Sequence, residues 1–483
     1  MEQLAGVRQR HGGGELAVTA ASSALHALSA VELLALYRRK EVSPVEVTRA
    51  VLARIERCEP LLHATWALDA GAALAMARAS EARWHKGEPL ALDGVPVTIK
   101  ENIATKGVAV PLGTAATELV PAAEDAPPAA RLREAGAVFV AKTTMPDYGM
   151  LSSGLSSFHA LARNPWDVSQ NPGGSSAGAG VAAAAGYGPL HIGTDIGGSI
   201  RLPACWCGIV GLKPSFGRVP IKPPFAGRAA GPMTRSVGDA ALMMGVLSAP
   251  DARDSMSLPP QPIRWLDLAG DVRGVRIGLW LDAGWGLALD AEVRAVVETA
   301  AHAFEAAGAI VEPLAPFTTR EMADGIDRFW RLRSWLDIAA LPPARRERVL
   351  PFIVDWARGG AEASGEQVYR GWYQMHAMRE ATVAATQRFD FVLSPVSPVT
   401  GYPAEWPGPT NDAARSLEHI GFTVPFNMSE QPAASVNAGY TARGMPVGLQ
   451  IIGRRFDDLG VLRLAHAWER LRPAQRAWPA VSA

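Results

Sequence analysis

Residues 171–200 consist mainly of Gly, Ala and Ser, and they constrain the fold more than any other part of the sequence. Side chains this small let a helix lie close against a sheet, so Ala177–Gly186 is predicted to form such a helix. Two short apolar runs, Gly94–Ile99 and Ala137–Ala141, are typical of buried strands, and a helix containing Ala129–Ala135 precedes the second. Strands that alternate with helices in this way predict an α/β fold.

The later segments continue the alternation. Gly274–Leu279 is predicted to be a strand and residues 290–307 a helix, while Phe391–Leu393 and Pro446–Ile452 are predicted to be late core strands. Residues 320–390 are predicted to be helical and are unusually rich in Trp and Tyr. Because no internal repeat or low-complexity tract divides the chain, one large domain fits better than several.

The N-terminal part has clear helix signals. Residues 1–24 are predicted to be a loose leader. Ser29 and Ser43 are each followed three residues later by a Glu, which is the pattern of a reciprocal capping box. Pro44 then occupies the first position of the second helix, where its missing N–H costs nothing. These signals predict a helical N-terminal layer rather than a separate domain.

Composition excludes several classes of function. Lys plus Arg equals Asp plus Glu at 47 each, so neither nucleic acid nor an anionic membrane is expected as a partner. Cys205-Trp-Cys207 has no second Cys or His cluster at ligand spacing, so no metal site is expected. The N-terminus has no apolar run typical of a signal peptide or a membrane span, which predicts a cytoplasmic protein.

Two glycine-rich segments each contain a serine. They are Asn171–Gly180 and Gly193–Arg201. Glycines beside a serine let the backbone turn sharply and leave N–H groups free. Free N–H groups from Ile196 to Ser199 would suit the negative oxygen that forms when an amide carbonyl is attacked. A nucleotide-binding loop is disfavoured because no Gly-Lys-Ser/Thr ending is present, and a plain close-packing turn is the other interpretation.

A serine nucleophile needs a base, and the sequence offers two kinds. His159 and His191 lie near the serines in the sequence, but no Gly-x-Ser-x-Gly elbow surrounds either serine. Lys100 ends an apolar strand, where burial would disfavour its ammonium form. A drop of about 3 from the usual lysine pKa would make it a base near neutral pH. Alone, such a lysine would be interpreted as structural; its partners change that interpretation.

Three motifs resemble those of the amidase signature family, the Ser–cis-Ser–Lys amidases. They are Gly94-Val-Pro-Val-Thr-Ile-Lys100, Gly173-Gly-Ser-Ser-Ala-Gly178 and Thr194-Asp-Ile-Gly-Gly-Ser-Ile-Arg-Leu-Pro203, in the order and at the spacing of the family. Further similar segments extend the resemblance over nearly the whole chain: Lys142–Met145, Arg163–Trp166, Gly211–Arg218, Gly231–Asp239, Phe426–Ser435 and Gly444–Gln450.

The resemblance implies a fold and a domain division. The fold is one large α/β domain with a central mixed β-sheet covered by helices on both faces. The expected amidase domain covers residues 25–475. Its parts are a helical N-terminal layer at 25–85, a signature core at about 90–240 and a helical region at about 320–390 that covers the substrate.

The resemblance also implies the roles of individual residues. Ser199 would be the nucleophile, Ser175 the proton relay and Lys100 the base, without a cofactor or a metal. The oxyanion would be held by the backbone N–H groups of Ile196, Gly197, Gly198 and Ser199. Tyr148, Gly149, Met150 and Leu151 would border the substrate, and Asp195 and Arg201 would brace the loop. Glu101 and Ala177 replace an Asp and a Gly of the family pattern, changes that affect the shape of the pocket and not the triad.

The expected substrate is a small amide, with a neutral aryl or acyl amide favoured. Trp and Tyr side chains from residues 320–380 would form an aromatic rim, unless they pack in the core instead. Carbamates, anilides and esters pass through the same tetrahedral intermediate, so the sequence leaves them open.

Two alternatives of different kinds are considered. The first is the A subunit of a glutamyl-tRNA amidotransferase, which releases ammonia from glutamine within a multi-subunit complex. In that protein, the substrate carboxylate is held in part by a Glu-Val-Lys-Arg-Arg-Ile stretch, and the corresponding residues here, Arg348–Ile353, lack the basic pair. The second is a catalytically silent binding protein of the same fold, which the intact triad disfavours. A homodimer is left open.

Overall fold

The computed structural model describes residues 25–481, so the predicted leader at 1–24 lies outside the described residues. Within them, eleven strands form one sheet in the order β1-β3-β2-β4-β6-β5-β10-β11-β9-β7-β8. The strands are β1 (Thr65–Trp66), β2 (Pro96–Lys100), β3 (Val138–Thr143), β4 (Leu190–Asp195), β5 (Val210–Lys213), β6 (Ala229–Thr234), β7 (Arg276–Leu279), β8 (Ile310–Pro313), β9 (Phe391–Pro395), β10 (Ala433–Tyr440) and β11 (Pro446–Gly453). A single sheet that contains both the first and the last strand confirms the predicted α/β domain.

The sheet is mixed, as predicted. β2 pairs in parallel with β3 and β4, and β7 pairs in parallel with β8 and β9. The other pairs are antiparallel. Because β2 and β4 are parallel neighbours, their carboxyl ends reach the same edge of the sheet. Lys100 ends β2 and Asp195 ends β4, so the topology brings two of the predicted motifs together.

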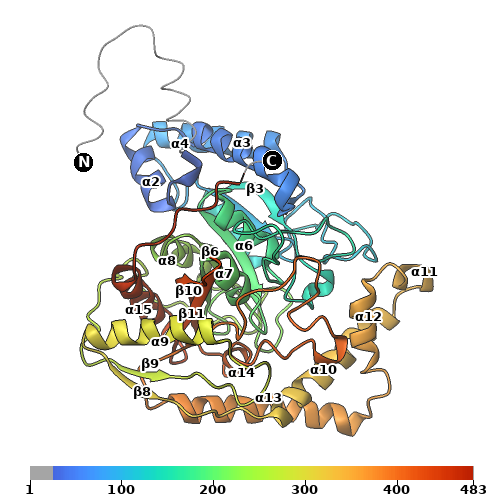
Figure 1. Cartoon of the computed structure of the whole chain (residues 1–483). Helices are drawn as coiled ribbons and strands as arrows, with labels where there is room; N and C mark the ends of the chain where they lie inside the picture. The colour runs from blue at the N-terminus through green and yellow to red at the C-terminus, as the bar shows by residue number, and fades with distance from the viewer. Residues whose placement is uncertain (1–24, 482–483) are drawn as a thin grey trace.

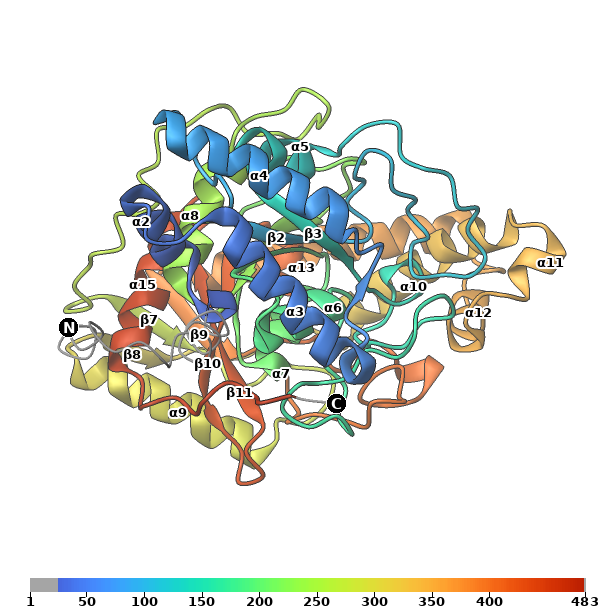
Figure 2. The ribbon, with the colours of Figure 1, turned by 90° about the horizontal axis from the view of Figure 1, so that it is seen from above.

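Helices surround the sheet (Figures 1 and 2). They are α2 (Ala30–Arg39), α3 (Pro44–Leu62), α4 (Ala70–Lys86), α5 (Pro127–Glu134), α6 (Ala177–Ala185), α7 (Arg201–Cys207), α8 (Val237–Leu247), α9 (Ala291–Ala306), α10 (Arg320–Ala339), α11 (Pro343–Arg346), α12 (Pro351–Arg358), α13 (Gly365–Thr386), α14 (Pro425–Met428) and α15 (Asp458–Leu471), with short 3₁₀ turns η1 (Leu25–Ala27), η2 (Asp147–Gly149) and η3 (Ala413–Arg415). Both predicted capping boxes are present, at Ser29 and at Ser43.

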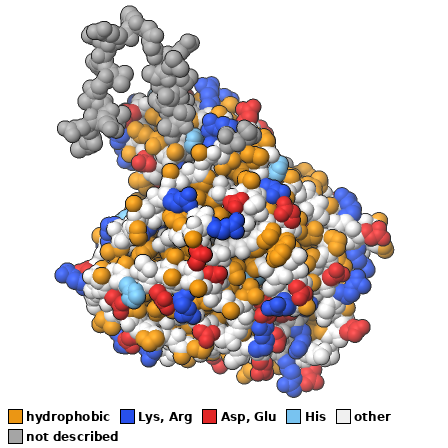
Figure 3. Space-filling view, viewed as in Figure 1, with side chains coloured by type: hydrophobic (Ala, Val, Ile, Leu, Met, Phe, Trp, Pro, Cys, Tyr) orange, Lys and Arg blue, Asp and Glu red, His pale blue; other side chains and the backbone are white. Residues whose placement is uncertain are grey.

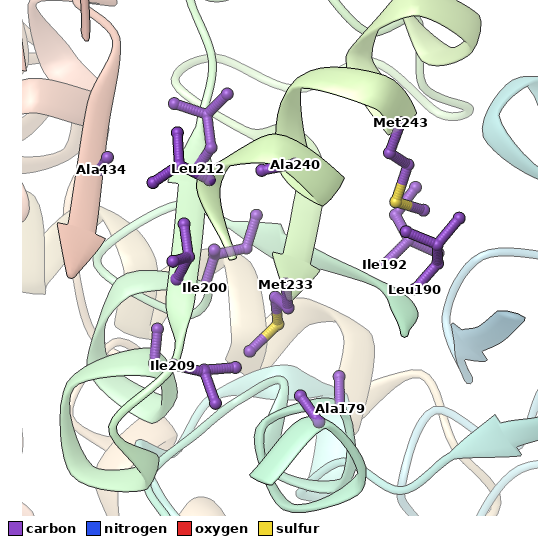
Figure 4. Packing of buried hydrophobic residues seen from close by; sticks show 14 of the residues in the cluster. Ala179, Leu190, Ile192, Ile200, Ile209, Leu212, Met233, Ala240, Met243 and Ala434 are labelled. Carbon is purple, nitrogen blue, oxygen red and sulfur yellow. The ribbon is translucent and has the colours of Figure 1, made fainter. Parts of the chain in front are cut away.

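The two faces of the sheet are covered by different helices. α6 and α7 contact each other and the sheet, whereas α8, α9 and α15 form a second set of helices in contact with it. In Figure 4, Met243 of α8 lies beside Leu190 and Ile192, while Met233 of β6 points toward Ala179 of α6. Every residue of α6 is buried, which its small side chains permit. The predicted close approach of this helix to the sheet is therefore observed.

The helical region α10–α13 extends from one side of the body, with α11 and α12 at its edge in both ribbon views (Figures 1 and 2). Basic and acidic side chains are interspersed over the face that Figure 3 shows. Among the helices of residues 25–481, none combines the length and the apolar character needed to cross a bilayer. In the same range, no group of three or more His, Cys, Asp or Glu side chains is placed to hold a metal ion.

Candidate active site

Lys100 is fully buried at the end of β2. Its Nζ lies 2.8 Å from Ser175 Oγ and 3.0 Å from Thr194 Oγ1, so its close side-chain neighbours are hydroxyls rather than carboxylates. Burial holds the pKa of Lys100 well below 10.5, and the positive charge of Arg228 lowers the pKa further, against the attraction of two carboxylates. The amine is thus placed to be uncharged and to accept a proton from a hydroxyl.

Ser175 and Ser176 lie just before α6, and their side chains have different partners. The peptide bond between Gly174 and Ser175 is cis. Ser175 Oγ contacts Lys100, whereas Ser176 Oγ donates a hydrogen bond to the carbonyl of Thr194 at 3.2 Å and accepts one from its N–H at 3.3 Å. Of the two adjacent hydroxyls, only that of Ser175 is available to the lysine.

Ser199 lies in the turn between β4 and α7 and lines the same cavity as Ser175. No hydrogen bond joins the two hydroxyls, and Ser199 Oγ has no hydrogen-bond partner within residues 25–481, so it is free to rotate toward Ser175 or toward a substrate. Gly198 has φ +126°, and a Cβ there would lie 2.7 Å from Thr423 Oγ1. The turn that presents Ser199 therefore requires glycine.

The same turn exposes backbone N–H groups. Those of Ile196, Gly197 and Ser199 have no acceptor within residues 25–481. The structure differs from the sequence-based expectation at Gly198, whose N–H donates to Asp195 Oδ1 at 2.9 Å. A carboxylate three residues before a turn accepts such an N–H readily, so Gly198 shapes the turn and three N–H groups remain for an oxyanion.

A buried polar network holds this turn in place. Arg201 contacts both carboxylate oxygens of Asp195, at 3.0 and 2.9 Å, and also donates to Asn427 at 2.6 Å and to Gln450 at 2.7 Å. Although burial alone would favour the neutral acid, the Arg201 guanidinium holds the pKa of Asp195 well below its usual range. The two side chains have the contacts of the bracing role that the sequence predicts for them.

A cavity of about 250 Å³ connects these groups. It is lined by Asn102, Leu112, Met145, Tyr148, Gly149, Met150, Ser175, Thr194, Asp195, Ile196, Ser199, Pro223, Phe225, Arg228, Arg333, Ser334 and Asp337. Three of the four predicted substrate-binding residues are on its wall. The fourth, Leu151, is only 5% exposed and packs in a hydrophobic cluster behind the wall.

The Trp and Tyr side chains of residues 320–380 do not line this cavity, and the alternative of core packing holds for two of them. Trp330 and Trp356 are buried in a hydrophobic cluster, and Tyr369 and Tyr373 of α13 are exposed on the surface. The cavity receives Arg333, Ser334 and Asp337 from α10 instead, and its aromatic wall comes from Tyr148 and Phe225. No local pattern in the sequence distinguishes these residues, because they reach the cavity only through the tertiary fold.

Neither histidine considered as a base reaches the cavity. The His191 ring lies 2.8 Å from Thr98 Oγ1 and 3.0 Å from the Gly188 carbonyl, and burial lowers the pKa of His191 to about 3. His159 contacts Glu101, which also accepts the Gly113 N–H at 2.5 Å. Glu101, the departure from the family pattern, thus fixes the loop beside the cavity wall.

Comparison with known proteins identifies the family. The family model described as Amidase matches residues 46–462. The chain belongs to the amidase signature family. It is therefore a hydrolase that acts on carbon–nitrogen bonds, as the sequence predicts.

Two kinds of relatives are found. The A subunit of the glutamyl-tRNA(Gln) amidotransferase of Myxococcus xanthus is 37% identical over 92% of this chain and 97% of its own. A bacterial aryl acylamidase of the amidase signature family superimposes with a TM-score of 0.85 at 31% identity, covering 93% of this chain and 97% of its own. The A subunit of the amidotransferase of Thermotoga maritima superimposes with a TM-score of 0.76 at 26% identity, covering 95% of this chain and 99% of its own. Both comparisons thus find amidotransferase A subunits, and the structural comparison also finds an aryl acylamidase.

Proposed function

We propose that the protein hydrolyses the C–N bond of a small amide through an acyl-enzyme on Ser199, with Ser175 as relay and Lys100 as base. One observation carries the proposal: a buried amine that has no ion-pair partner among residues 25–481 lies 2.8 Å from the hydroxyl of Ser175, and Ser175 lines the same cavity as Ser199. On this proposal the enzyme is cytoplasmic and needs a small-molecule amide but no nucleic acid; a homodimer is compatible with it.

The proposed reaction starts with two proton transfers. Neutral Lys100 takes the proton of Ser175, which takes the proton of Ser199 as Ser199 Oγ attacks the carbonyl carbon. Catalytic hydrogen bonds often form only once substrate is bound, which would bring the two hydroxyls together. The N–H groups of Ile196, Gly197 and Ser199 would stabilise the oxyanion, each such donor typically contributing about 3 kcal/mol. The proton passes to the leaving nitrogen as the C–N bond breaks, and water then releases the acid from Ser199.

The cavity wall supports a substrate with an apolar part. Leu112, Met150 and Phe225 provide apolar surface, and a volume of about 250 Å³ suits a small acyl or aryl group. The similarity to an aryl acylamidase favours the same kind of substrate. Anilides, carbamates and esters with such groups are compatible with the proposed chemistry.

A glutaminase role is the second candidate, because of the 37% identity to an amidotransferase A subunit. The region expected to replace the basic pair of that relative, residues 348–353, contributes no side chain to the cavity wall. The apolar part of the cavity wall and the similarity to an aryl acylamidase favour hydrolysis of amides by the chain alone, and the following panel decides between the two candidates.

A panel of substrates tests this choice. We expect the purified chain to hydrolyse anilides or aryl amides at least tenfold more efficiently, in kcat/KM, than it releases ammonia from glutamine. One cavity contact that an aryl group makes and glutamine lacks is worth about that factor. Product release would be measured for amides, anilides, carbamates and glutamine. Efficient glutamine hydrolysis, or hydrolysis of glutamine alone, would instead support the amidotransferase candidate.

The rate of hydrolysis should depend on pH through Lys100. Only the uncharged amine can accept a proton, so kcat/KM should rise with pH through the pKa of Lys100 and then level off. Because burial lowers that pKa well below 10.5, the rise should be complete far below the pH at which an ordinary lysine titrates. A pH–rate profile on a neutral anilide would measure the midpoint. A midpoint near 10.5 would mean that a solvated lysine, or another group, is the base.

A further inference from the structure

Two arginines from distant parts of the chain line the cavity. Arg228 comes just before β6, and Arg333 lies on α10. Their charges act on each other: burial and the neighbouring Arg333 guanidinium lower the pKa of Arg228 to about 10. Two positive charges are thus held at the wall of a small cavity that also contains the proposed nucleophile.

Neither arginine has a carboxylate partner within 4.0 Å among residues 25–481. Arg228 makes one long hydrogen bond, 3.4 Å, to the carbonyl of Pro223. The Arg333 guanidinium lies 4.5 Å from the centre of the Phe225 ring and forms no hydrogen bond within the described range. Phe225 therefore holds Arg333 in position without neutralising it.

Two fully buried arginines of this chain are treated differently from Arg228 and Arg333, which are partly exposed. Arg201 pairs with Asp195 at 2.9 Å, and Arg218 pairs with Asp458 at 3.1 Å, and all four of these side chains are almost fully buried. A buried charge without a partner is costly, so buried charges are normally paired.

Arg54 and Arg235 also lack a carboxylate within 4.0 Å among residues 25–481, but their guanidinium groups donate to backbone carbonyls. Arg228 makes only one long hydrogen bond and Arg333 none in the same range, so the cavity presents two guanidinium groups with free donors, which indicates that a ligand supplies the acceptors.

We propose that Arg228 and Arg333 form a carboxylate-binding subsite, so that the substrate is an amide that also carries a carboxylate group. The planar guanidinium presents paired donors that match the two oxygens of a carboxylate. Asp337 also lines the cavity and its charge acts on Arg333, but its side chain is exposed and lies beyond the 4.0 Å of an ion pair. The inference rests on the proposed amide hydrolysis and departs from the neutral substrate that the sequence favours.

Two matched pairs of substrates test the subsite. Succinanilate and butyranilide differ by a carboxylate on the acyl side, and para-acetamidobenzoate and acetanilide differ by one on the leaving group. In at least one pair, kcat/KM should be about tenfold or more higher for the carboxylate member, since a hydrogen bond to a charged group contributes about that factor. The preference should weaken as salt is added. Preference for the neutral member in both pairs would overturn the inference.

Arg228→Gln and Arg333→Gln should each reduce the preference by about tenfold, measured as the ratio of kcat/KM within a pair. The ratio is the proper readout because the Arg228 charge also lowers the pKa of Lys100 and affects both members alike. If the Arg228 variant fails to fold, Arg333→Gln still tests the subsite, because Arg333 makes no hydrogen bond in the described structure that the substitution could break. Arg328→Gln, on the exposed side of α10, is the control and should leave the ratio unchanged. An unchanged ratio in both cavity variants would contradict the subsite.

Binding to Ser199→Ala separates this inference from the proposed function. Calorimetric titration of that variant with the same four compounds should show tighter binding of a carboxylate member, and the added Arg333→Gln should abolish the difference. If the carboxylate binds preferentially but the wild type hydrolyses nothing, the subsite stands and the proposed function fails. If the wild type hydrolyses amides without any carboxylate preference, the function stands and the subsite fails.

Discussion

Replacing Ser199 by alanine should reduce kcat by about a millionfold, the size of the loss when a triad nucleophile is removed. We expect neither neighbouring serine to substitute for it, because Ser175 is the proposed relay to Lys100 and Ser176 is hydrogen-bonded to the backbone of Thr194. Turnover of an anilide would be measured together with labelling by a fluorophosphonate probe. The wild type should be labelled at Ser199 and the variant should not be labelled.

The fold should survive this substitution, which makes the loss interpretable. Ser199 Oγ has no hydrogen-bond partner within residues 25–481, so its removal should leave the melting temperature nearly unchanged. Ser176→Ala is the matched control: it loses hydrogen bonds to Thr194 and about 1 kcal/mol of stability, but should retain activity. A folded Ser199→Ala protein that keeps substantial turnover, or that is still labelled, would place the nucleophile elsewhere. Persistent turnover would also exclude the alternative of a catalytically silent binding protein.

The strands that the sequence predicts well are those with continuous apolar runs. β2, β3 and β11 lie where apolar residues indicate them, because strands buried on both faces are apolar throughout. The strand β6, Ala-Ala-Gly-Pro-Met-Thr, was not predicted as a strand, since small residues and a proline give no such signal. It is a strand because it pairs with β4 on one side and β5 on the other. Tertiary pairing here outweighs local preference.

The residues of the site also fall into those that the sequence predicts and those that it does not. Lys100, Ser175 and Ser199 are found by short motifs, since each depends on its immediate neighbours for a turn or a strand end. Arg228 and Arg333 carry no motif, and only the fold brings them to one cavity. The hydrogen bond from Gly198 to Asp195 was also not predicted, because the motif shows which N–H groups exist but not which are already occupied.

Replacing Lys100 by methionine should reduce kcat by about ten-thousandfold or more, because it removes the base of a unit that acts together. Methionine has nearly the same length as the lysine stem and fills the same buried space, so the sheet edge should stay intact. Anilide turnover would be measured with Lys106→Met, an exposed neighbour on the chain, as the control that should keep full activity. A folded Lys100→Met protein with turnover close to the wild type would rule out Lys100 as the base.

The stability of the wild type, compared with that of Lys100→Met, shows whether the buried amine is charged. In the unfolded chain Lys100 is protonated below about 10.5, whereas burial keeps it uncharged in the folded chain down to a much lower pH. Between these two pKa values the unfolded state binds more protons, so the wild-type free energy of unfolding rises with pH. Methionine removes this contribution. The stability of the wild type relative to Lys100→Met should therefore rise as the pH is raised toward 10.5, as measured by denaturant unfolding at several pH values. A difference that is flat over this range would mean that the buried amine is charged in the folded protein, and a charged amine cannot take the proton of Ser175.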